Sequence, residues 1–248
     1  MTKELEGKTA LVTGAGGGIG SAIAATLVAE GAIVVALDRD ANQLAKLTER
    51  LGPACEATVA DLGEAEAVTG AAGAAVEKHG GIDILVNNAG VLSPDKLAAT
   101  TLAEWRRLMA INLDAALLLT QAVTPKMVEK GWGRIINIAS YAWKSGGLTA
   151  GTGYSVSKAA LVGLTFSTAR ELAPTGVTAN AIAPAYVVSP MITEQLSEEA
   201  RARQLAAIPV GRFCQPEEVA HAVRFLASPL SGFMTGTIVD MNGGLQFG

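Results

Sequence analysis

Tyr154 and Lys158 are the residues best suited to proton chemistry, because four positions separate them inside an expected helix at 154–172. Side chains at this spacing share one face of a helix and can meet. A free phenol has a pKa of about 10 and is a poor base at neutral pH. A nearby ammonium should stabilise the phenolate and lower that pKa, so that Tyr154 could exchange a proton with an alcohol or a ketone. Taken alone, a Tyr-x-x-x-Lys pair is more often surface packing.

A glycine-rich segment at 12–20 follows an expected strand and opens an expected helix. Bare backbone there lets the chain turn tightly and lets N–H groups approach a pyrophosphate. The segment lacks a Gly-Lys-Ser/Thr ending, which excludes a nucleoside-triphosphatase loop. We therefore expect a dinucleotide site, the alternative being a flexible turn. Its expected residues are Gly14, Gly17, Gly18, Ile19 and Gly20.

Asp38 ends the second expected strand, 18 residues after Gly20. A carboxylate at this place can accept hydrogen bonds from the adenosine ribose hydroxyls and would repel a 2′-phosphate. It favours NAD over NADP as the cofactor. Arg39 beside it could instead neutralise such a phosphate, and both residues could also be solvated loop charges.

Short apolar segments alternate with longer alanine-rich segments along the whole chain. Seven short segments, mostly β-branched, are expected strands: 9–12, 33–37, 55–60, 84–86, 134–139, 178–182 and 237–239. Six longer ones have helical periodicity: 19–30, 41–51, 64–78, 102–129, 154–172 and 216–226. This alternation predicts an α/β fold of Rossmann type, a doubly wound parallel sheet of about seven strands with helices on both faces.

The 248 residues contain no linker, repeat or block of charge, so we expect one domain that spans 1–248. The long segment at 184–196 contains two prolines and no strand pattern, which is typical of a binding loop. We expect a substrate loop or lid that extends from 184 to about 212.

Composition excludes several classes of protein. The 19 basic and 23 acidic residues give a net charge of -4, which is unlike a nucleic-acid-binding protein, and the 50% hydrophobic content excludes disorder. The uncharged segments at 9–29 and 172–193 are long enough to cross a bilayer but are interrupted by glycine or proline. Cys55 and Cys214 lack metal-ligand or disulfide spacing, and the first residues show no secretory signal. We expect a cytoplasmic protein that binds no metal, nucleic acid or membrane.

Several motifs together resemble those of the classical short-chain dehydrogenase/reductases. They are Thr13-Gly-x-x-x-Gly-Ile-Gly20, Asn87-Asn88-Ala89-Gly90, Asn112, Ser140 and Tyr154-x-x-x-Lys158, in this order over nearly the whole chain. The resemblance implies that Tyr154 is the general acid or base of a hydride transfer between a secondary alcohol and its ketone. It also implies that Lys158 holds the nicotinamide ribose, that Ser140 hydrogen-bonds the substrate oxygen, and that Asn112 positions a water that relays protons to Lys158.

The same resemblance implies further binding residues. Asp61 and Leu62 would bracket the adenine, and Thr13 would tie the phosphate loop to the segment Asn88, Ala89 and Gly90, which closes against the ribose and phosphate. The nicotinamide carboxamide would meet Pro184, Val187 and Ser189. The substrate pocket would be walled by Tyr141, Trp143, Leu148, Tyr186 and Met191, with Leu92 and Gly147 beside them. Lys144 would either recognise a substrate anion or be solvated.

Two features depart from the family pattern. Ala185 stands where the family usually has a glycine after proline, so a left-handed backbone would be strained there. The spacing of 14 residues from Ser140 to Tyr154 is one more than the commonest, which changes the wall of the pocket.

The sequence leaves the substrate class open. A 3-oxoacyl-[acyl-carrier-protein] reductase is a common role for such a chain, but such enzymes generally use NADP, against which Asp38 argues. Oxidation of a polyol or sugar with NAD is equally compatible. A non-catalytic dinucleotide-binding sensor is a further alternative, which the complete proton-transfer set disfavours. The resemblance also implies a homotetramer, and the apolar or small faces at 110–122 and 155–169 agree with subunit contacts.

Overall fold

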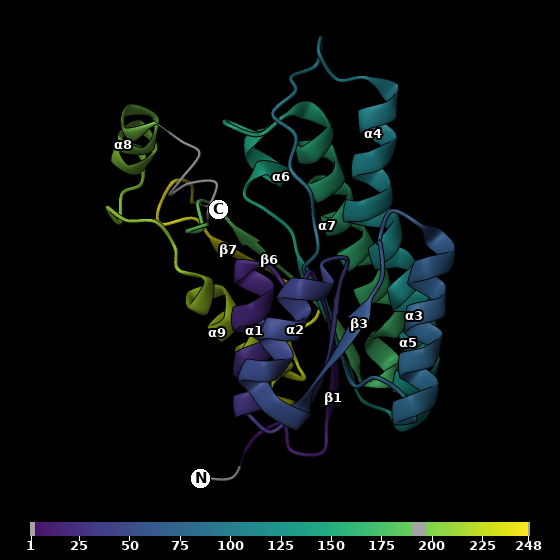
Figure 1. The fold of residues 1–248 in the computed structure, drawn as a ribbon. Helices are drawn as coiled ribbons and strands as arrows, with labels where there is room; N and C mark the ends of the chain where they lie inside the picture. Colours follow the sequence, from purple (N-terminus) through teal and green to yellow (C-terminus); the bar gives the residue numbers. More distant parts are fainter. Residues whose placement is uncertain (1–2, 190–196, 248) are drawn as a thin grey trace.

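The computed structural model describes residues 3–189 and 197–247 (Figure 1). Within them, seven strands form one sheet in the order β3-β2-β1-β4-β5-β6-β7. The strands are β1 (Thr9–Thr13), β2 (Ile33–Asp38), β3 (Cys55–Val59), β4 (Ile84–Asn87), β5 (Gly133–Ile138), β6 (Val177–Pro184) and β7 (Ile238–Met241). Every neighbouring pair is parallel. The predicted doubly wound parallel sheet is therefore confirmed, with each strand end within two residues of its expected position.

Helices cover both faces of the sheet, as predicted (Figure 1). One face packs on α1 (Gly18–Ala29), α2 (Ala41–Leu51) and α9 (Pro216–Ala227). The other packs on α3 (Ala65–His79), α5 (Ala115–Lys130) and α7 (Thr152–Leu172). Alternate residues of a strand point to opposite faces, so Ala10 and Val12 of β1 belong to the first core and Leu11 to the second. Burial on both sides explains why the central strands β1 and β4 are mostly apolar.

The helix expected at 102–129 is interrupted. It consists of α4 (Leu102–Met109), a π-helical turn (Ala110–Asp114) and α5, and the interruption contains Asn112. By length and composition alone, Leu102–Lys130 could cross a membrane, with 39% of its most apolar window buried. Its residues Leu119, Val123 and Met127 are buried in the core beneath the sheet, as expected for an interior helix.

Two short helices were not predicted. Helix α6 (Ala142–Ser145) follows β5, and α8 (Glu198–Ala207) lies inside the segment that we expected to be a loop. Helix α8 consists of alanine, glutamate, arginine, glutamine and leucine, which are all strong helix formers. Its composition therefore indicates a helix, although its apolar residues show no helical periodicity. Figure 1 shows α6 and α8 at the same end of the sheet.

Candidate active site

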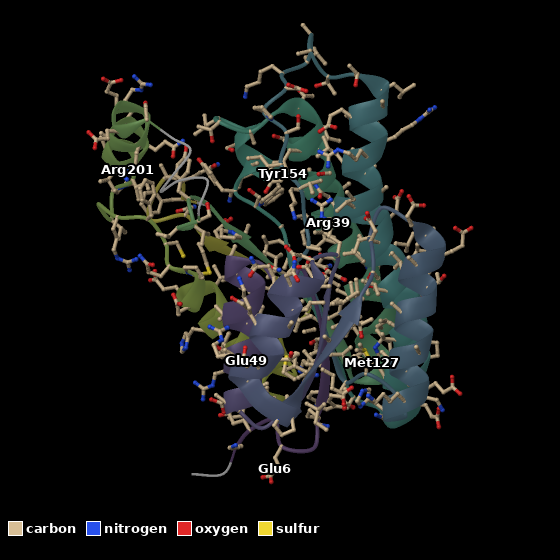
Figure 2. All side chains as sticks on the ribbon, in the orientation of Figure 1. Glu6, Arg39, Glu49, Met127, Tyr154 and Arg201 are labelled. Atoms are coloured by element: carbon tan, nitrogen blue, oxygen red, sulfur yellow. The ribbon has the colours of Figure 1, made fainter. Side chains whose placement is uncertain are left out.

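A cavity of about 1040 Å³ opens at the carboxyl ends of β1, β2, β4, β5 and β6. The strand order reverses between β1 and β4, and ligands of open α/β sheets bind at such a switch point. All the residues expected to bind the cofactor line this cavity: Gly14, Gly17, Gly18, Ile19, Gly20, Asp38, Arg39, Asp61, Leu62, Asn88, Ala89, Gly90, Tyr154, Lys158, Pro184, Val187 and Ser189. Figure 2 shows Arg39 and Tyr154 at one end of the sheet and Glu6 at the other.

The glycine-rich loop is shaped for a close approach of backbone to backbone. Gly14 has φ +63°, a left-handed conformation that glycine adopts without strain. A Cβ at Gly20 would collide with the carbonyl oxygen of Gly14, so no larger residue fits there. A Cβ at Gly18, by contrast, would meet nothing within 4 Å, although Gly18 lines the cavity.

The start of α1 fits an anionic group. Its N-cap residue, Gly17, makes no side-chain hydrogen bond, and its first turn contains no acidic residue. The first N–H groups of the helix therefore lack a side-chain cap, and the positive end of the helix dipole faces the cavity. Together with the open space at Gly18, this arrangement fits the pyrophosphate of a dinucleotide.

Thr13 ties the phosphate loop to the segment after β4, as the sequence suggested. Its Oγ1 accepts hydrogen bonds from the N–H groups of Asn88 and Ala89, both at 3.0 Å. The Asn88 side-chain amide donates back to the carbonyl oxygens of Thr13 at 2.9 Å and Gly14 at 3.2 Å. These bonds fix two neighbouring loops that both line the cavity.

Asp38 is held in a fixed orientation at the end of β2. Its Oδ2 accepts a hydrogen bond from Gly16 N–H at 3.0 Å, and its Oδ1 accepts one from Asp40 N–H at 3.1 Å. The carboxylate is thus anchored by backbone and remains on the cavity wall. Arg39 is exposed on the same wall.

Asp61 and Leu62 lie at the same end of the cavity but differ in burial. Asp61 is exposed and its Oδ1 accepts a hydrogen bond from Gly63 N–H at 2.8 Å. Leu62 is buried and belongs to the core that packs on α3 and α5. The apolar side chain can pack on the face of a heteroaromatic ring such as adenine, and the carboxylate can accept hydrogen bonds from its edge.

Ser140 and Tyr154 meet at the other end of the cavity. The Ser140 hydroxyl lies close enough to lower the pKa of Tyr154, and both residues line the cavity wall. Ser140 stands directly after β5, where its Oγ accepts a hydrogen bond from Ala142 N–H at 3.2 Å, at the start of α6. Tyr154 lies in the first turn of α7. The strand end and the helix start therefore place two hydroxyl groups side by side.

Lys158 lies one turn along α7 and is buried, with 3% of its surface exposed. Its Nζ donates a hydrogen bond to the carbonyl oxygen of Ile138 at 2.8 Å and lies 5.9 Å from the centroid of the Tyr154 ring. Burial lowers the pKa of Lys158 to about 8. Burial also raises the pKa of Tyr154, and the nearby Ser140 hydroxyl only partly opposes this rise. The expected net lowering of the phenol pKa is therefore wrong for this structure.

Asn112 does not line the large cavity and lies buried behind it. Its amide nitrogen donates to the Val91 carbonyl oxygen at 3.0 Å and to Ser157 Oγ at 2.9 Å, and its Oδ1 accepts from Val91 N–H at 2.8 Å. Ser157 in turn donates to the carbonyl oxygen of Tyr154 at 2.7 Å. The side chain of Asn112 thus fastens the loop after β4 to the catalytic end of α7, and the water relay stays a prediction.

The backbone after β6 follows an ordinary path, which corrects the concern about Ala185. No residue other than glycine has a positive φ among the described residues. Ala185 N–H donates to the carbonyl oxygen of Met241 at 3.0 Å. Two further bonds join Tyr186 and Val188 to Cys214, at 2.9 Å each, so that the start of the loop is pinned to a second strand-like segment.

The expected substrate wall is only partly correct. Tyr141, Leu148 and Tyr186 line the cavity, as do Leu92 and Gly147. Trp143 does not, because the turn of α6 places its ring against the small core of Ala139, Val162, Ala181 and Ala183. Met191 lies outside the described residues.

Lys144 is neither solvated nor directed to a substrate anion. Its Nζ forms an ion pair with Asp240 Oδ2 at 2.7 Å, and its side chain is 13% exposed. Asp240 belongs to β7, 96 residues away in the sequence, so no local pattern could reveal this partner.

The structure adds cavity residues that the sequence did not single out. Ser145, the last residue of α6, and Thr149 come from the segment that contains the additional residue between Ser140 and Tyr154, and Gln204 comes from α8. Lys96 stands behind this loop and donates to the carbonyl oxygens of Gly147 and Ala150, both at 2.6 Å. Neither Lys96 nor Gln204 belongs to a motif, and only the three-dimensional contacts reveal them.

Known proteins resemble this chain over almost its full length. A family model described as Enoyl-(Acyl carrier protein) reductase matches residues 14–246. The 3-oxoacyl-[acyl-carrier-protein] reductase FabG of Aquifex aeolicus is 38% identical, and the match covers 99% of this chain and 100% of that protein. Nodulation protein G of Azospirillum brasilense is 39% identical, with 97% and 98% covered.

One solved structure, from Beutenbergia cavernae, shares 38% identity with a TM-score of 0.91, and the match covers 99% of each chain. That protein is provisionally described as an NAD(P) dependent gluconate 5-dehydrogenase, and it holds NADP at low occupancy.

Proposed function

The chain belongs to the classical short-chain dehydrogenase/reductase family, and from this premise we propose that it transfers hydride between NAD(H) and a secondary alcohol or its ketone. Members of the family that match it are oxidoreductases, and the chain is accordingly an oxidoreductase that acts on CH–OH or ketone groups with a nicotinamide cofactor. The choice of NAD and the nature of the substrate are the parts that we propose.

One observation carries the proposal: the hydroxyls of Ser140 and Tyr154 lie on the wall of the same cavity as the glycine-rich loop. When bound, the cofactor would supply the hydride chemistry. Ser140 would donate a hydrogen bond to the substrate oxygen, and Tyr154 would give or take its proton. Lys158 would hold a positive charge beside the phenol and bind the nicotinamide ribose. Residues of the segment Pro184, Val187 and Ser189 would hold the carboxamide.

Asp38 supports NAD as the cofactor. Its carboxylate is anchored to Gly16 and Asp40 and lies on the cavity wall, where it can accept hydrogen bonds from ribose hydroxyls and would repel a phosphate. Arg39 supports the second candidate, an NADP-dependent 3-oxoacyl-[acyl-carrier-protein] reductase, because its exposed guanidinium lines the same wall. The names of several relatives and the NADP in the structural neighbour also favour this alternative.

The test is to follow the absorbance of reduced nicotinamide across a panel of secondary alcohols and ketones, with each cofactor in turn. We expect turnover with NAD(H) and a kcat/KM at least about tenfold above that with NADP(H). A tenfold ratio corresponds to about 1.4 kcal/mol, which is the energy expected of one contact between charges in a polar site. A preference for NADP(H) would replace the first candidate by the second. No turnover with either cofactor, combined with tight NADH binding, would instead support a non-catalytic sensor.

We also propose a single domain, a cytoplasmic location and a homotetramer. Exposed apolar side chains on two long helices support the assembly, since such patches favour burial between subunits: Leu117 and Val128 on α5, and Val156 and Phe166 on α7. Light scattering after size-exclusion chromatography should give four times the mass of the 25.3 kDa chain. A monomer at micromolar concentration would contradict the assembly.

A further inference from the structure

Gln204 is the only cavity-lining residue that α8 supplies within the described part of the chain. Its Oε1 is buried and accepts no hydrogen bond from any described residue. Buried amide oxygens are nearly always paired, so this one calls for a donor from whatever fills the cavity. Helix α8 stands at the end of the sheet where α6 also lies, beyond the strand ends (Figure 1).

The charges that line the cavity are confined to its cofactor end and to the catalytic lysine. They belong to Asp38, Arg39, Asp61 and Lys158 among the described residues. Lys158 Nζ is already hydrogen-bonded to Ile138. Apart from Lys158, the described residues at the substrate end are therefore uncharged, and their polar groups are hydroxyls and the amide of Gln204. Besides those of Ser140 and Tyr154, the hydroxyls belong to Tyr141, Ser145, Thr149 and Tyr186.

Two cations near the substrate end have other partners. Lys144 is paired with Asp240, and Lys96 donates to the carbonyl oxygens of Gly147 and Ala150. In addition, residues 190–196 contain neither lysine nor arginine in their sequence. Among the described residues that line the cavity, Lys158 is the only cation outside the cofactor end, and a substrate carboxylate would therefore lack a cation of its own at the substrate end, which is costly.

We propose that Gln204 determines specificity by hydrogen-bonding a second hydroxyl of a neutral, polyhydroxylated substrate of the polyol or sugar class. Either end of the amide can pair with a hydroxyl, because a hydroxyl both donates and accepts. The uncharged walls disfavour the corresponding sugar acids. This inference rests on the proposed alcohol and ketone chemistry at Tyr154 and names its substrate class.

The experiment compares three kinds of substrate at the wild-type enzyme: six-carbon polyols such as sorbitol and mannitol, the matched sugar acid gluconate, and 2-hexanol. Sorbitol and gluconate differ only in whether C1 is an alcohol or a carboxylate, so they isolate the charge. We expect kcat/KM for the best polyol to exceed that for gluconate by at least about tenfold, since a buried carboxylate lacks a partner.

Two substitutions then examine Gln204 itself. Gln204→Leu removes the hydrogen bond at similar volume, and it should lower kcat/KM for the polyol by about tenfold while 2-hexanol changes by less than about twofold. Gln204→Lys supplies a cation and should raise the ratio of gluconate to polyol turnover by at least about tenfold. Arg203→Ala is the matched control, because Arg203 is exposed on the same helix and does not line the cavity.

The outcomes separate this inference from the proposed function. Oxidation of gluconate or 2-hexanol in preference to every polyol would overturn the role of Gln204 but uphold the dehydrogenase. Equal effects of Gln204→Leu on polyol and 2-hexanol would likewise overturn it, since the residue would then act only on folding or on the cofactor. Absence of turnover with all alcohols and ketones would overturn the dehydrogenase itself.

Discussion

The Nζ of Lys158 lies 5.9 Å from the ring centroid of Tyr154, and its hydrogen bond goes to the Ile138 carbonyl oxygen rather than to the phenol. A protonated Lys158 would therefore act on the tyrosine through its charge and not through a hydrogen bond. Because both residues are buried enough to shift their pKa values, the charge state of Lys158 should control how readily the phenol can lose or regain its proton.

The pH dependence of ketone reduction should follow from this pair. The pKa of Lys158 is lowered to about 8, whereas that of Tyr154 is raised above its usual value of 10. As pH rises through about 8, Lys158 loses its charge while Tyr154 keeps its proton, so kcat/KM for reduction should fall above about pH 8. NADH binding, followed by fluorescence over the same pH range, separates loss of chemistry from loss of cofactor. A rate that stays constant up to pH 10, where Lys158 should be neutral, would contradict this role.

Asp38→Asn should shift the cofactor preference. The amide oxygen can still accept from one of the two backbone N–H groups, that of Gly16 or that of Asp40, and the substitution removes the negative charge. We expect the ratio of kcat/KM for NAD to that for NADP to fall by about tenfold, the effect of one charge contact. Asp61→Asn is the matched control, because Asp61 is a carboxylate on the same cavity that should leave the ratio unchanged. A similar fall in both variants would mean that Asp38 does not select the cofactor.

Gly20→Ala and Gly18→Ala should separate folding from cofactor binding. A Cβ at Gly20 would collide with the Gly14 carbonyl, so this variant should lose about 1–3 kcal/mol of stability, as overpacked sites do. A Cβ at Gly18 would enter open space on the cavity wall, so that variant should keep its Tm but raise the KM for NAD(H). Thermal unfolding and initial-rate kinetics give the two readouts. Equal Tm losses would show that the loop packs differently.

Lys96→Met should weaken substrate binding more than chemistry. Lys96 holds the loop of Gly147 and Ala150 by two hydrogen bonds of 2.6 Å, and this loop walls the substrate end of the cavity. Without them the wall should loosen, and the KM for the substrate should rise by about tenfold while kcat changes little. Lys96→Arg can donate to the same carbonyl oxygens and should restore part of the loss. An unchanged KM would remove Lys96 as a positioning residue.

The sheet and the cofactor end could be predicted from the sequence because their signals are local. Central strands such as β1 and β4 are buried on both faces and therefore mostly apolar, and Asp38 occupies a fixed place relative to the glycine-rich loop. The bond from Thr13 to the segment of Asn88 could likewise be anticipated, since parallel strands bring their carboxyl ends together.

The substrate end could not be predicted in the same way. The ion pair of Lys144 with Asp240 joins residues 96 positions apart, and the packing of Trp143 depends on a single turn of helix that no periodicity reveals. Gln204 reaches the cavity only because α8 forms where a loop was expected. The pKa of Tyr154 is raised, whereas the sequence predicted a lowered one. Burial causes the rise, and burial depends on every element that packs around Tyr154, whereas the spacing to Lys158 concerns only its own helix.

The central claim is that Tyr154 carries the proton in hydride transfer, and Tyr154→Phe tests it most directly. The substitution keeps the ring and removes the hydroxyl that lies beside Ser140 on the cavity wall. Single-turnover measurements of NADH oxidation by ketone, with NADH binding and Tm recorded alongside, should show the rate falling by about 10²–10⁴-fold while NADH affinity stays within about twofold. A Tyr154→Phe enzyme that folds, binds NADH and retains the wild-type rate would contradict the mechanism.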